Sequence, residues 1–333
     1  MSMFRFASLL FLLALAACSN QPAAPQVFPP PPLWYVTPEE NNRQWLVGVA
    51  GGADLEHAIT AAQQDLLARI NREIESGYPL DQLPAVFGPQ PQIKQDVRQE
   101  VADIGPGSYQ IQRSTRLDVH QYAVQIRIAR QELVQQHQRA LDSRLALLRQ
   151  RLQQTSHSDA LVQEQQAQHT VTASRKLAAS IIILASLDNG FNQQPYLDQL
   201  TEFSRQHQQL KHSLQFTLYN QHSARQPLQM LKQALLERGY RVDSSSQRPG
   251  AFQIHLSTHD ERSRSNSGAH IARLTLDLRV IDHRNRQVAT NRLHLTGRGK
   301  DSYQQAELAA FNQFAQQIQQ QGLFAVLGVA PPR

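Results

Sequence analysis

Cys18 is the residue of this 333-residue chain whose type and position could do chemistry of its own. It is the only cysteine, and it directly follows Leu15-Ala16-Ala17 at the end of an apolar run. Arg5 precedes that run, and the order of basic, apolar and small residues is typical of a secretory signal and its cleavage site. The run is shorter than the roughly 20 apolar residues that span a bilayer. We therefore expect the thiol at the start of an exported chain.

The stretch Leu15-Ala16-Ala17-Cys18 resembles the lipobox of bacterial lipoproteins. The resemblance implies that residues 1–17 are a signal peptide cleaved between Ala17 and Cys18. It also implies that Cys18 receives a diacylglycerol and an acyl chain, with no other cofactor. Ser19 stands where an aspartate would retain a lipoprotein at the inner membrane, so sorting to the outer membrane is implied. The alternatives are a plain cleaved signal or a chance cysteine.

The composition narrows the classes of partner and of site. The formal net charge is +6, the arginines are interspersed with acids, and no Lys/Arg run of nucleic-acid-binding type is present. We therefore expect no nucleic acid partner. A chain whose only cysteine is lipidated forms no internal disulfide and must be stabilised by core burial. Beyond the signal, the longest apolar run is Ala178–Leu187, about half the length needed to span a membrane.

The chain begins with a tether and a first folded module. Residues 18–32 are rich in Gln, Ala and Pro and end in four prolines, a composition that favours extended polyproline geometry. Residues 33–130 are predicted to form an α+β module. Its elements are a strand at 44–49, a helix from the N-cap Asp54 to about Ser76, a loop at 78–91, and two or three strands within 93–104 and 109–130.

Residues 131–212 have helical periodicity. Val134, Leu141 and Leu148 lie seven residues apart, a spacing that forms an apolar seam for packing against another helix. Another helix precedes Asn189, and a third follows at 196–211. An antiparallel helical hairpin bridging two domains is one interpretation, and a partner-binding coiled coil is the other.

Residues 213–327 are predicted to form a second α+β module. Alternating apolar residues indicate strands around Phe216, Ile254, Leu276 and the segment 287–296, with a polar loop at 257–268. A helix lies between the first two strands. Ser302 begins the final helix as a capping box with Gln305.

The two modules share a pattern of a strand that ends in glycine, followed by a helix with an alanine face. Gly51 aligns with Gly299, and the caps Asp54 and Ser302 then coincide. The helix faces agree as well, with Ala58, Ala61, Ala62, Leu66 and Ile70 falling on Ala306, Ala309, Ala310, Phe314 and Ile318. We interpret the pattern as two related modules bridged by helices.

The first module is similar to the LPP-twenty family of envelope lipoproteins. The shared features are the lipobox cysteine, the proline tether, the aromatic entry Pro32-Leu33-Trp34-Tyr35, the glycine-ended strand 45–52, the alanine-bearing helix and a late strand with Arg130. The resemblance covers about 18–140. It implies an outer-membrane lipoprotein without catalysis, and some relatives accompany the flagellar apparatus. The second module resembles, at the level of fold, small α/β domains of envelope-assembly lipoproteins, including curli-export and penicillin-binding-protein activators.

No catalytic or metal site is predicted. His255 and His259 have a metal-like spacing, but on a strand four residues span about 13 Å, too far for one ion. Gly297-Arg298-Gly299-Lys300 lacks the earlier glycine of a phosphate loop, and nucleophile signatures such as Gly-x-Ser-x-Gly are missing. Trp34 and Tyr35 are candidates for partner binding, with sealing of the module edge as the alternative.

The sequence therefore predicts an α+β protein of two small two-layer α/β modules joined by a long helical hairpin, after a signal peptide and a Pro-rich tether. We expect a non-enzymatic lipoprotein of the outer membrane, facing the periplasm. Its expected role is that of a scaffold or assembly factor for an envelope or flagellar complex. The alternative is a periplasmic regulator that binds peptidoglycan or cell-wall enzymes.

Overall fold

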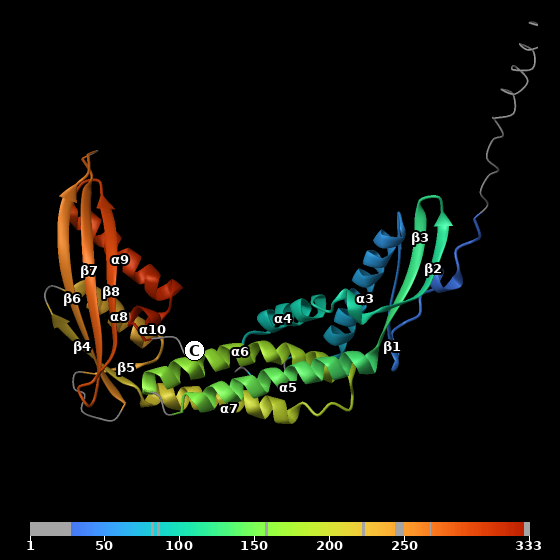
Figure 1. Ribbon diagram of the computed structural model, residues 1–333, viewed down its shortest axis with the longest axis horizontal. Coiled ribbons are helices and arrows are strands. Elements are labelled where there is room, and N and C mark those ends of the chain that lie inside the picture. Colours follow the sequence, from blue (N-terminus) through green and yellow to red (C-terminus); the bar gives the residue numbers. More distant parts are fainter. Residues whose placement is uncertain are drawn as a thin grey trace, which may run out of the picture. The chain divides into compact units, whose positions relative to one another are not determined.

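The computed structural model describes residues 28–80, 83–84, 87–156, 159–221, 224–243, 250–266 and 268–329 (Figure 1). It has the predicted α+β class, with two sheets and long helices. The chain divides into two compact units. The first comprises the described residues up to Ile70 together with Gly105–Ala129, and the second comprises Asn71–Ile104 and the chain from Arg130 onward.

The first sheet consists of β1 (Trp45–Gly52), β2 (Gln110–Asp118) and β3 (Gln121–Ala129), in the antiparallel order β1-β3-β2. Helix α3 (Leu55–Gly77) follows β1, as the N-cap Asp54 predicted. The short helix α2 (Leu33–Val36) precedes the sheet. The face that α3 buries within this unit is formed by Ala58, Ala62, Leu66 and Ile70, as predicted, but Leu55, which was predicted on the same face from its helical spacing, is 43% exposed.

Two glycines of β1 let α3 lie close to the sheet. A Cβ atom at Gly48 would lie 2.2 Å from the carbonyl oxygen of Ala62, and one at Gly52 would lie 2.3 Å from the backbone nitrogen of Ala58. Because real Cβ atoms do not approach backbone so closely, any side chain at either position would push the helix away. The alanine face and the glycines are thus two halves of one packing contact.

Residues 93–104 were predicted to form a strand, and this was wrong. They belong to helix α4 (Gln90–Ala102), which buries Ile93, Val97 and Val101. The three β-branched side chains suggested a strand, but their spacing of four residues is helical. Pro91 lies in the first turn, where a proline is tolerated because its missing N–H would have no partner.

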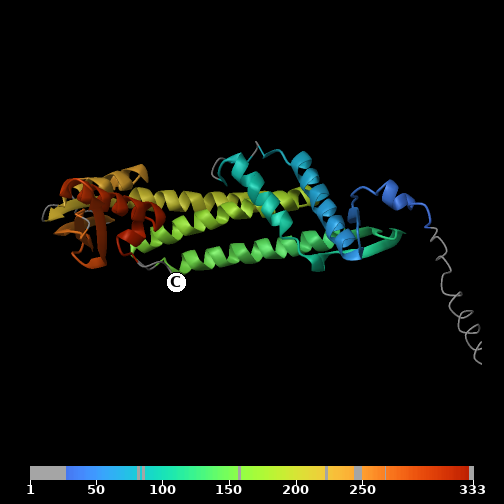
Figure 2. The same ribbon diagram turned by 90° about the horizontal axis from the view of Figure 1, so that it is seen from above.

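Helices α5 (Arg130–Gln154), α6 (Ala160–Leu187) and α7 (Gln194–Ser213) follow. Figure 2 shows them side by side, with α6 in contact with α4, α5 and α7. The predicted seam on α5 is buried at Val134, Leu141 and Leu148. Contact with α6 is intramolecular, which is the packing that the hairpin interpretation requires.

Helix α6 extends well beyond the apolar run Ala178–Leu187 that the sequence analysis compared with a membrane span. Among the described residues it alone is long and apolar enough to cross a membrane by length and composition. Two thirds (67%) of the 18-residue window that meets this test is nevertheless buried inside the protein, as in the core helix of a bundle.

The second sheet has the order β5-β4-β6-β7-β8. Its strands are β4 (Gln215–Gln221), β5 (Arg241–Val242), β6 (Ala251–Arg264), β7 (His270–Asp282) and β8 (Gln287–Gly299). Strand β4 runs parallel to β5 and β6, and the other neighbours are antiparallel. Helices α8 (Arg225–Glu237), α9 (Tyr303–Gln320) and α10 (Leu323–Val326) lie on one side of this sheet (Figure 1).

The predicted polar loop at 257–268 was wrong over most of its length. Strand β6 continues through it to Arg264 and pairs residue by residue with β7, ending at the pair Arg264 and His270. The described residues 265, 266, 268 and 269 lie between the two strands, with Gly268 at a φ of 82°. Polar side chains are compatible with a strand whose outer face meets water, so composition misidentified this segment.

The predicted repeat holds for the helices and is shifted by one residue in the strands. Ala306, Ala310, Phe314 and Ile318 of α9 are buried like their counterparts in α3, and the Ser302 hydroxyl accepts the Gln305 N–H as the predicted cap. A Cβ at Gly299 would lie 2.6 Å from the nitrogen of Ala306. In the first module the residue with the matching close approach to the helix is Gly52, not Gly51. A Cβ atom on Gly51 would lie on the other face of β1, next to the Tyr35 hydroxyl.

Candidate functional site

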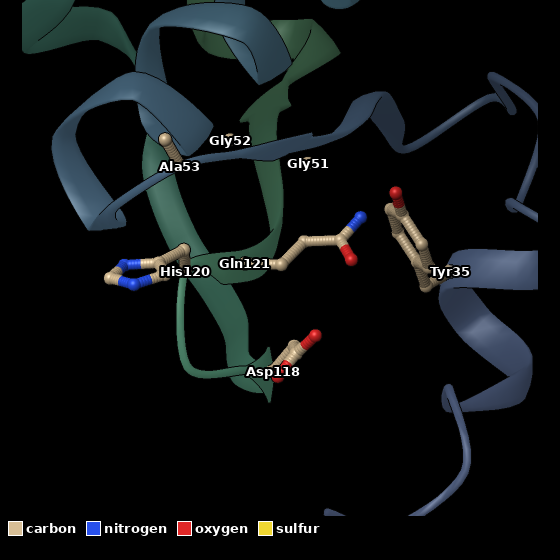
Figure 3. A pocket seen from close by; sticks show the side chains of 7 residues that line it. All are labelled: Tyr35, Gly51, Gly52, Ala53, Asp118, His120 and Gln121. Carbon is tan, nitrogen blue, oxygen red and sulfur yellow. The ribbon is translucent and has the colours of Figure 1, made fainter.

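A surface hollow of about 450 Å³ lies where β1 ends and β2 turns into β3. We call it the turn hollow. Figure 3 shows that its lining residues come from three places, namely α2, the end of β1 and the β2–β3 turn, and that the Gln121 side chain points toward Tyr35 while the His120 ring points the other way. They are Tyr35, Gly51, Gly52, Ala53, Asp118, His120 and Gln121.

Tyr35 is held at this hollow by Gly51. The Tyr35 hydroxyl lies 2.6 Å from the point where a Cβ on Gly51 would be, so a larger residue there would displace the ring. Trp34 packs edge-to-face on Tyr35 with 6.2 Å between ring centroids, and both rings are half-buried. The structure thus brings one of the two predicted aromatic residues to a concave surface and leaves the other beside it. A binding role for the pair remains a prediction.

The β2–β3 turn presents three lining residues in a fixed geometry. The Asp118 carboxylate accepts the N–H of Val119 at 2.6 Å. Arg116 donates to the carbonyl oxygens of Asp118 and Val119 at 3.2 and 2.9 Å, and its guanidinium lies 5.9 Å from the ring centroid of Tyr122. Since two residues separate the strands, the turn is short, and the Arg116 contacts limit its freedom further.

A second hollow of about 630 Å³ shares Gly51, Gly52 and Ala53 with the first and extends along the start of α3. The N–H of His57 donates to Asp54 at 2.9 Å, and its ring lies 2.8 Å from the same carboxylate. These hydrogen bonds lower the pKa of Asp54, and the bond to Asp54 raises the pKa of His57. The helix start therefore has its own anionic cap and is not an open anion site.

Exposed apolar side chains gather next to the lining residues. Leu33 is 82% exposed and Val36 63% exposed on the two sides of Trp34 and Tyr35, and Val119 is 47% exposed between two lining residues. Leu55, exposed at the start of α3, follows the shared glycines. Exposed apolar residues near a concave surface are typical of sites for protein partners.

The charged groups of the two hollows are mainly acidic. Asp118 and Glu56 line them, and neither forms an ion pair within the described part of the chain. Arg116, the nearest arginine in the turn, is already engaged by backbone carbonyl groups. A partner segment that combines apolar with basic side chains would complement this surface.

The polar groups of the two hollows are partly engaged within the chain. Among the residues that the structure describes, the turn hollow is lined by no serine, threonine, cysteine or lysine, and the Asp118 carboxylate that lines it accepts the N–H of Val119. In the second hollow the Thr60 hydroxyl donates to the carbonyl of Glu56. Across the described ranges, no group of three or more His, Cys, Asp or Glu residues could hold a metal ion. His255 lies on β6, as expected, and His259, which was predicted to lie in the polar loop, lies on the same strand four residues further on.

Cys18 and Ala17, the predicted lipidation and cleavage residues, lie outside the described residues. The sequence did not predict Asp118, His120 or Gln121 as site residues. A signal was available, because Asp118-Val119-His120-Gln121 interrupts two alternating segments with a short turn. Its meeting with Tyr35 and Gly51 depends on sheet order, which local pattern does not determine.

Comparison with known proteins assigns no family. No protein-family model matches the chain, and no curated protein matches it. Solved structures with partial similarity include a secreted protein of Helicobacter pylori, at 12% identity and a TM-score of 0.41, covering 84% of this chain and 98% of that one. A minor lipoprotein of Acinetobacter baumannii has 18% identity and a TM-score of 0.30, covering 35% of this chain and 96% of that one. Rare lipoprotein B of Shewanella oneidensis has 14% identity and a TM-score of 0.25, covering 32% and 92%. Likeness at this level assigns neither fold nor function.

Proposed function

We propose that this chain is a non-enzymatic lipoprotein of the outer membrane that acts as a periplasmic scaffold or assembly factor for an envelope or flagellar complex. The observation that carries the proposal is the set of exposed apolar side chains around the turn hollow, Leu33, Val36 and Val119. Leu33 and Val36 follow directly on a proline-rich tether and a lipobox-like cysteine in the sequence. The anchor keeps the chain at a membrane, and the hollow supplies a surface for a partner.

The partner segment is expected to be apolar and basic. Apolar side chains would cover Leu33, Val36 and Val119, and basic groups would neutralise Asp118 and Glu56. A wall hydrolase is a weaker candidate, because glycan hydrolysis mostly uses a pair of carboxylates and, of the described residues, Asp118 is the one carboxylate that lines the turn hollow. The resemblance of the first module to the LPP-twenty family supports an envelope or flagellar partner.

Affinity capture from detergent-solubilised membranes tests this proposal. The tagged full-length lipoprotein should recover a defined set of envelope proteins. Val119→Glu should reduce that recovery about tenfold, because it places a third carboxylate on an acidic surface. Leu147→Glu is the matched control, since Leu147 is 46% exposed on α5 and lines neither hollow. Equal recovery with both variants would refute the assignment of the site.

Replacement of the anchor residue tests the other half of the proposal. Cys18→Ser should move the protein from the membrane fraction to the soluble fraction, because lipidation requires the thiol. Two or more acyl chains give stable anchoring. Among the described residues, the helix that could span a membrane by length and composition, α6, has two thirds (67%) of its apolar window buried inside the protein. Fractionation followed by immunoblotting measures the shift. A variant that stays in the membrane fraction would show that the anchor lies elsewhere.

A further inference from the structure

The second sheet has one face that helices do not cover. Helices α8, α9 and α10 pack on one side of it (Figure 1), where Phe216, Ile254 and Leu276 are buried. Because side chains alternate along a strand, the residues between them point to the opposite face. This outer face carries polar, basic and aromatic side chains, including Tyr219, His255, Ser257, Arg273, Thr275, Arg279, Arg292, His294 and Arg298.

An aromatic stack and a guanidinium lie in one row across the outer face. Tyr219 of β4 is directly opposite His255 of β6, and His255 is directly opposite Arg279 of β7. The Tyr219 and His255 rings are stacked, with 4.8 Å between centroids and 12° between planes. Burial, and then the charge of Arg279, lower the pKa of His255, which favours the neutral form of its ring. The row thus offers a flat aromatic stack beside an exposed cation.

The outer face has more cationic than anionic groups. Arg273, Arg279 and Arg298 form no ion pair with any described residue, while Arg292 donates to Asp277 at 2.6 Å. The remaining acid of the face, Glu261, lies directly opposite Arg273. Three guanidinium groups therefore face solvent without a carboxylate contact, and they would recognise carboxylates with paired hydrogen bonds.

Neutral hydrogen-bonding groups fill the spaces between these residues. Ser257, Thr275 and Thr296 are short and hydroxyl-bearing, and Tyr219 is the one large apolar side chain exposed on the face. A protein partner would require more apolar area than this. An anionic phospholipid surface would meet the arginines but has no flat sugar ring to lie on the Tyr219–His255 stack. A polymer of sugar rings that carries carboxylates fits both the stack and the arginines.

We propose that the outer face of the second sheet binds peptidoglycan, with a sugar ring on Tyr219 and stem-peptide carboxylates on Arg279 and Arg273. This site is separate from the turn hollow in residues and in chemistry. The chain would thereby hold a membrane anchor, a protein-binding surface and a wall-binding surface. Loss of one surface should leave the other unchanged.

Co-sedimentation with purified peptidoglycan sacculi tests the inference, using the full-length lipoprotein in mild detergent. The wild type should pellet with sacculi in a saturable manner. Tyr219→Leu and Arg279→Gln should each raise the dissociation constant about tenfold, by removing the stacking surface and a charge-assisted hydrogen bond. Arg139→Gln is the control, since Arg139 is exposed on α5 and its substitution should leave binding unchanged.

Two further arms separate the parts of the ligand. With sacculi whose stem peptides have been removed enzymatically, Arg279→Gln should bind like the wild type, while Tyr219→Leu still binds more weakly. Vesicles of lipopolysaccharide should not retain the protein beyond its detergent background. The inference is overturned if the wild type does not pellet with intact sacculi, if both variants bind like Arg139→Gln, or if lipopolysaccharide is preferred. Affinity capture through the turn hollow should be unaffected by either variant, so the two sites can fail independently.

Discussion

Gly297→Ala is expected to lower the free energy of unfolding by about 3 kcal/mol, the upper end for overpacking a well-filled interior. A Cβ at this position would lie 1.8 Å from the carbonyl oxygen of Ala306 and 2.5 Å from the nitrogen of Ala310. Both atoms are backbone, so no side-chain rotation relieves the clash, and α9 has to move away from the sheet. Urea denaturation, followed by circular dichroism, measures the loss.

Gly107→Ala is the matched control for this prediction. Its Cβ would have no heavy atom within 4 Å, and its φ is not in the left-handed region. We expect its free energy of unfolding to stay within about 0.5 kcal/mol of the wild type. If Gly297→Ala unfolds at the same urea concentration as Gly107→Ala, the close contact between β8 and α9 does not exist in solution.

Glu164→Ala is expected to lower the free energy of unfolding by about 3 kcal/mol. The Glu164 carboxylate on α6 is fully buried, and one of its oxygens accepts the hydroxyl hydrogen of Tyr240. The His207 ring lies 3.2 Å from the same oxygen, and the Lys211 amine lies 5.5 Å from the Tyr240 ring centroid. Removal of the carboxylate leaves the hydroxyl and the imidazole buried without this acceptor. Glu132→Ala, at an exposed glutamate of α5, is the control, and it should change the free energy of unfolding only slightly.

The same cluster predicts how stability depends on pH. Burial, together with the charge and hydrogen bond of Glu164, raises the pKa of Tyr240 above its ordinary value of 10.0. A raised pKa means that the folded state holds the proton more tightly. The contribution of Tyr240 to the free energy of unfolding is therefore complete below pH 10, and it is lost as the pH rises through the pKa of Tyr240 in the folded state. Urea midpoints between about pH 9 and 11 should fall less for Tyr240→Phe than for the wild type. Equal slopes would contradict the buried contact.

The helices that carry an alanine face were the elements most predictable from the sequence. In α3 and α9 the cap, the helical spacing and the small residues all favour the same packing, and Ala58 and Ala306 are buried as expected. Such a segment can be predicted from sequence because its local signals agree with one another. In α4 the β-branched Ile93, Val97 and Val101 favoured a strand, and only their spacing identified the helix.

The candidate site was only partly predictable. Tyr35 was singled out as an aromatic residue after a tether. Asp118 and His120 come from the hairpin turn between β2 and β3, and the sequence analysis did not locate that turn within 109–130. Likewise, the polar residues after Leu256 concealed a strand, because half of them lie on an open sheet face. Both omissions have one cause. Which residues share a surface is decided by strand order and register, and these depend on contacts between distant segments.

Three parts of this chain have three proposed roles. A lipidated cysteine would anchor it, the turn hollow around Tyr35 and Val119 would bind a protein segment, and the outer face of the second sheet would bind the wall. Each role depends on different residues and on different chemistry, so each has its own variant and its own control. Binding of a partner at the hollow is the central one, because it distinguishes a scaffold from a simple membrane–wall link.

Site-specific photocrosslinking in intact cells tests that role most directly. A photoreactive amino acid at position 119 reports what lies against the turn hollow, and the same group at position 147 reports on an exposed apolar position of α5. We predict an adduct from position 119 to an envelope protein whose crosslinked segment is apolar and basic, with no such adduct from position 147. The absence of an adduct at 119, or identical adducts from both positions, would contradict the assignment of the hollow as a partner-binding site.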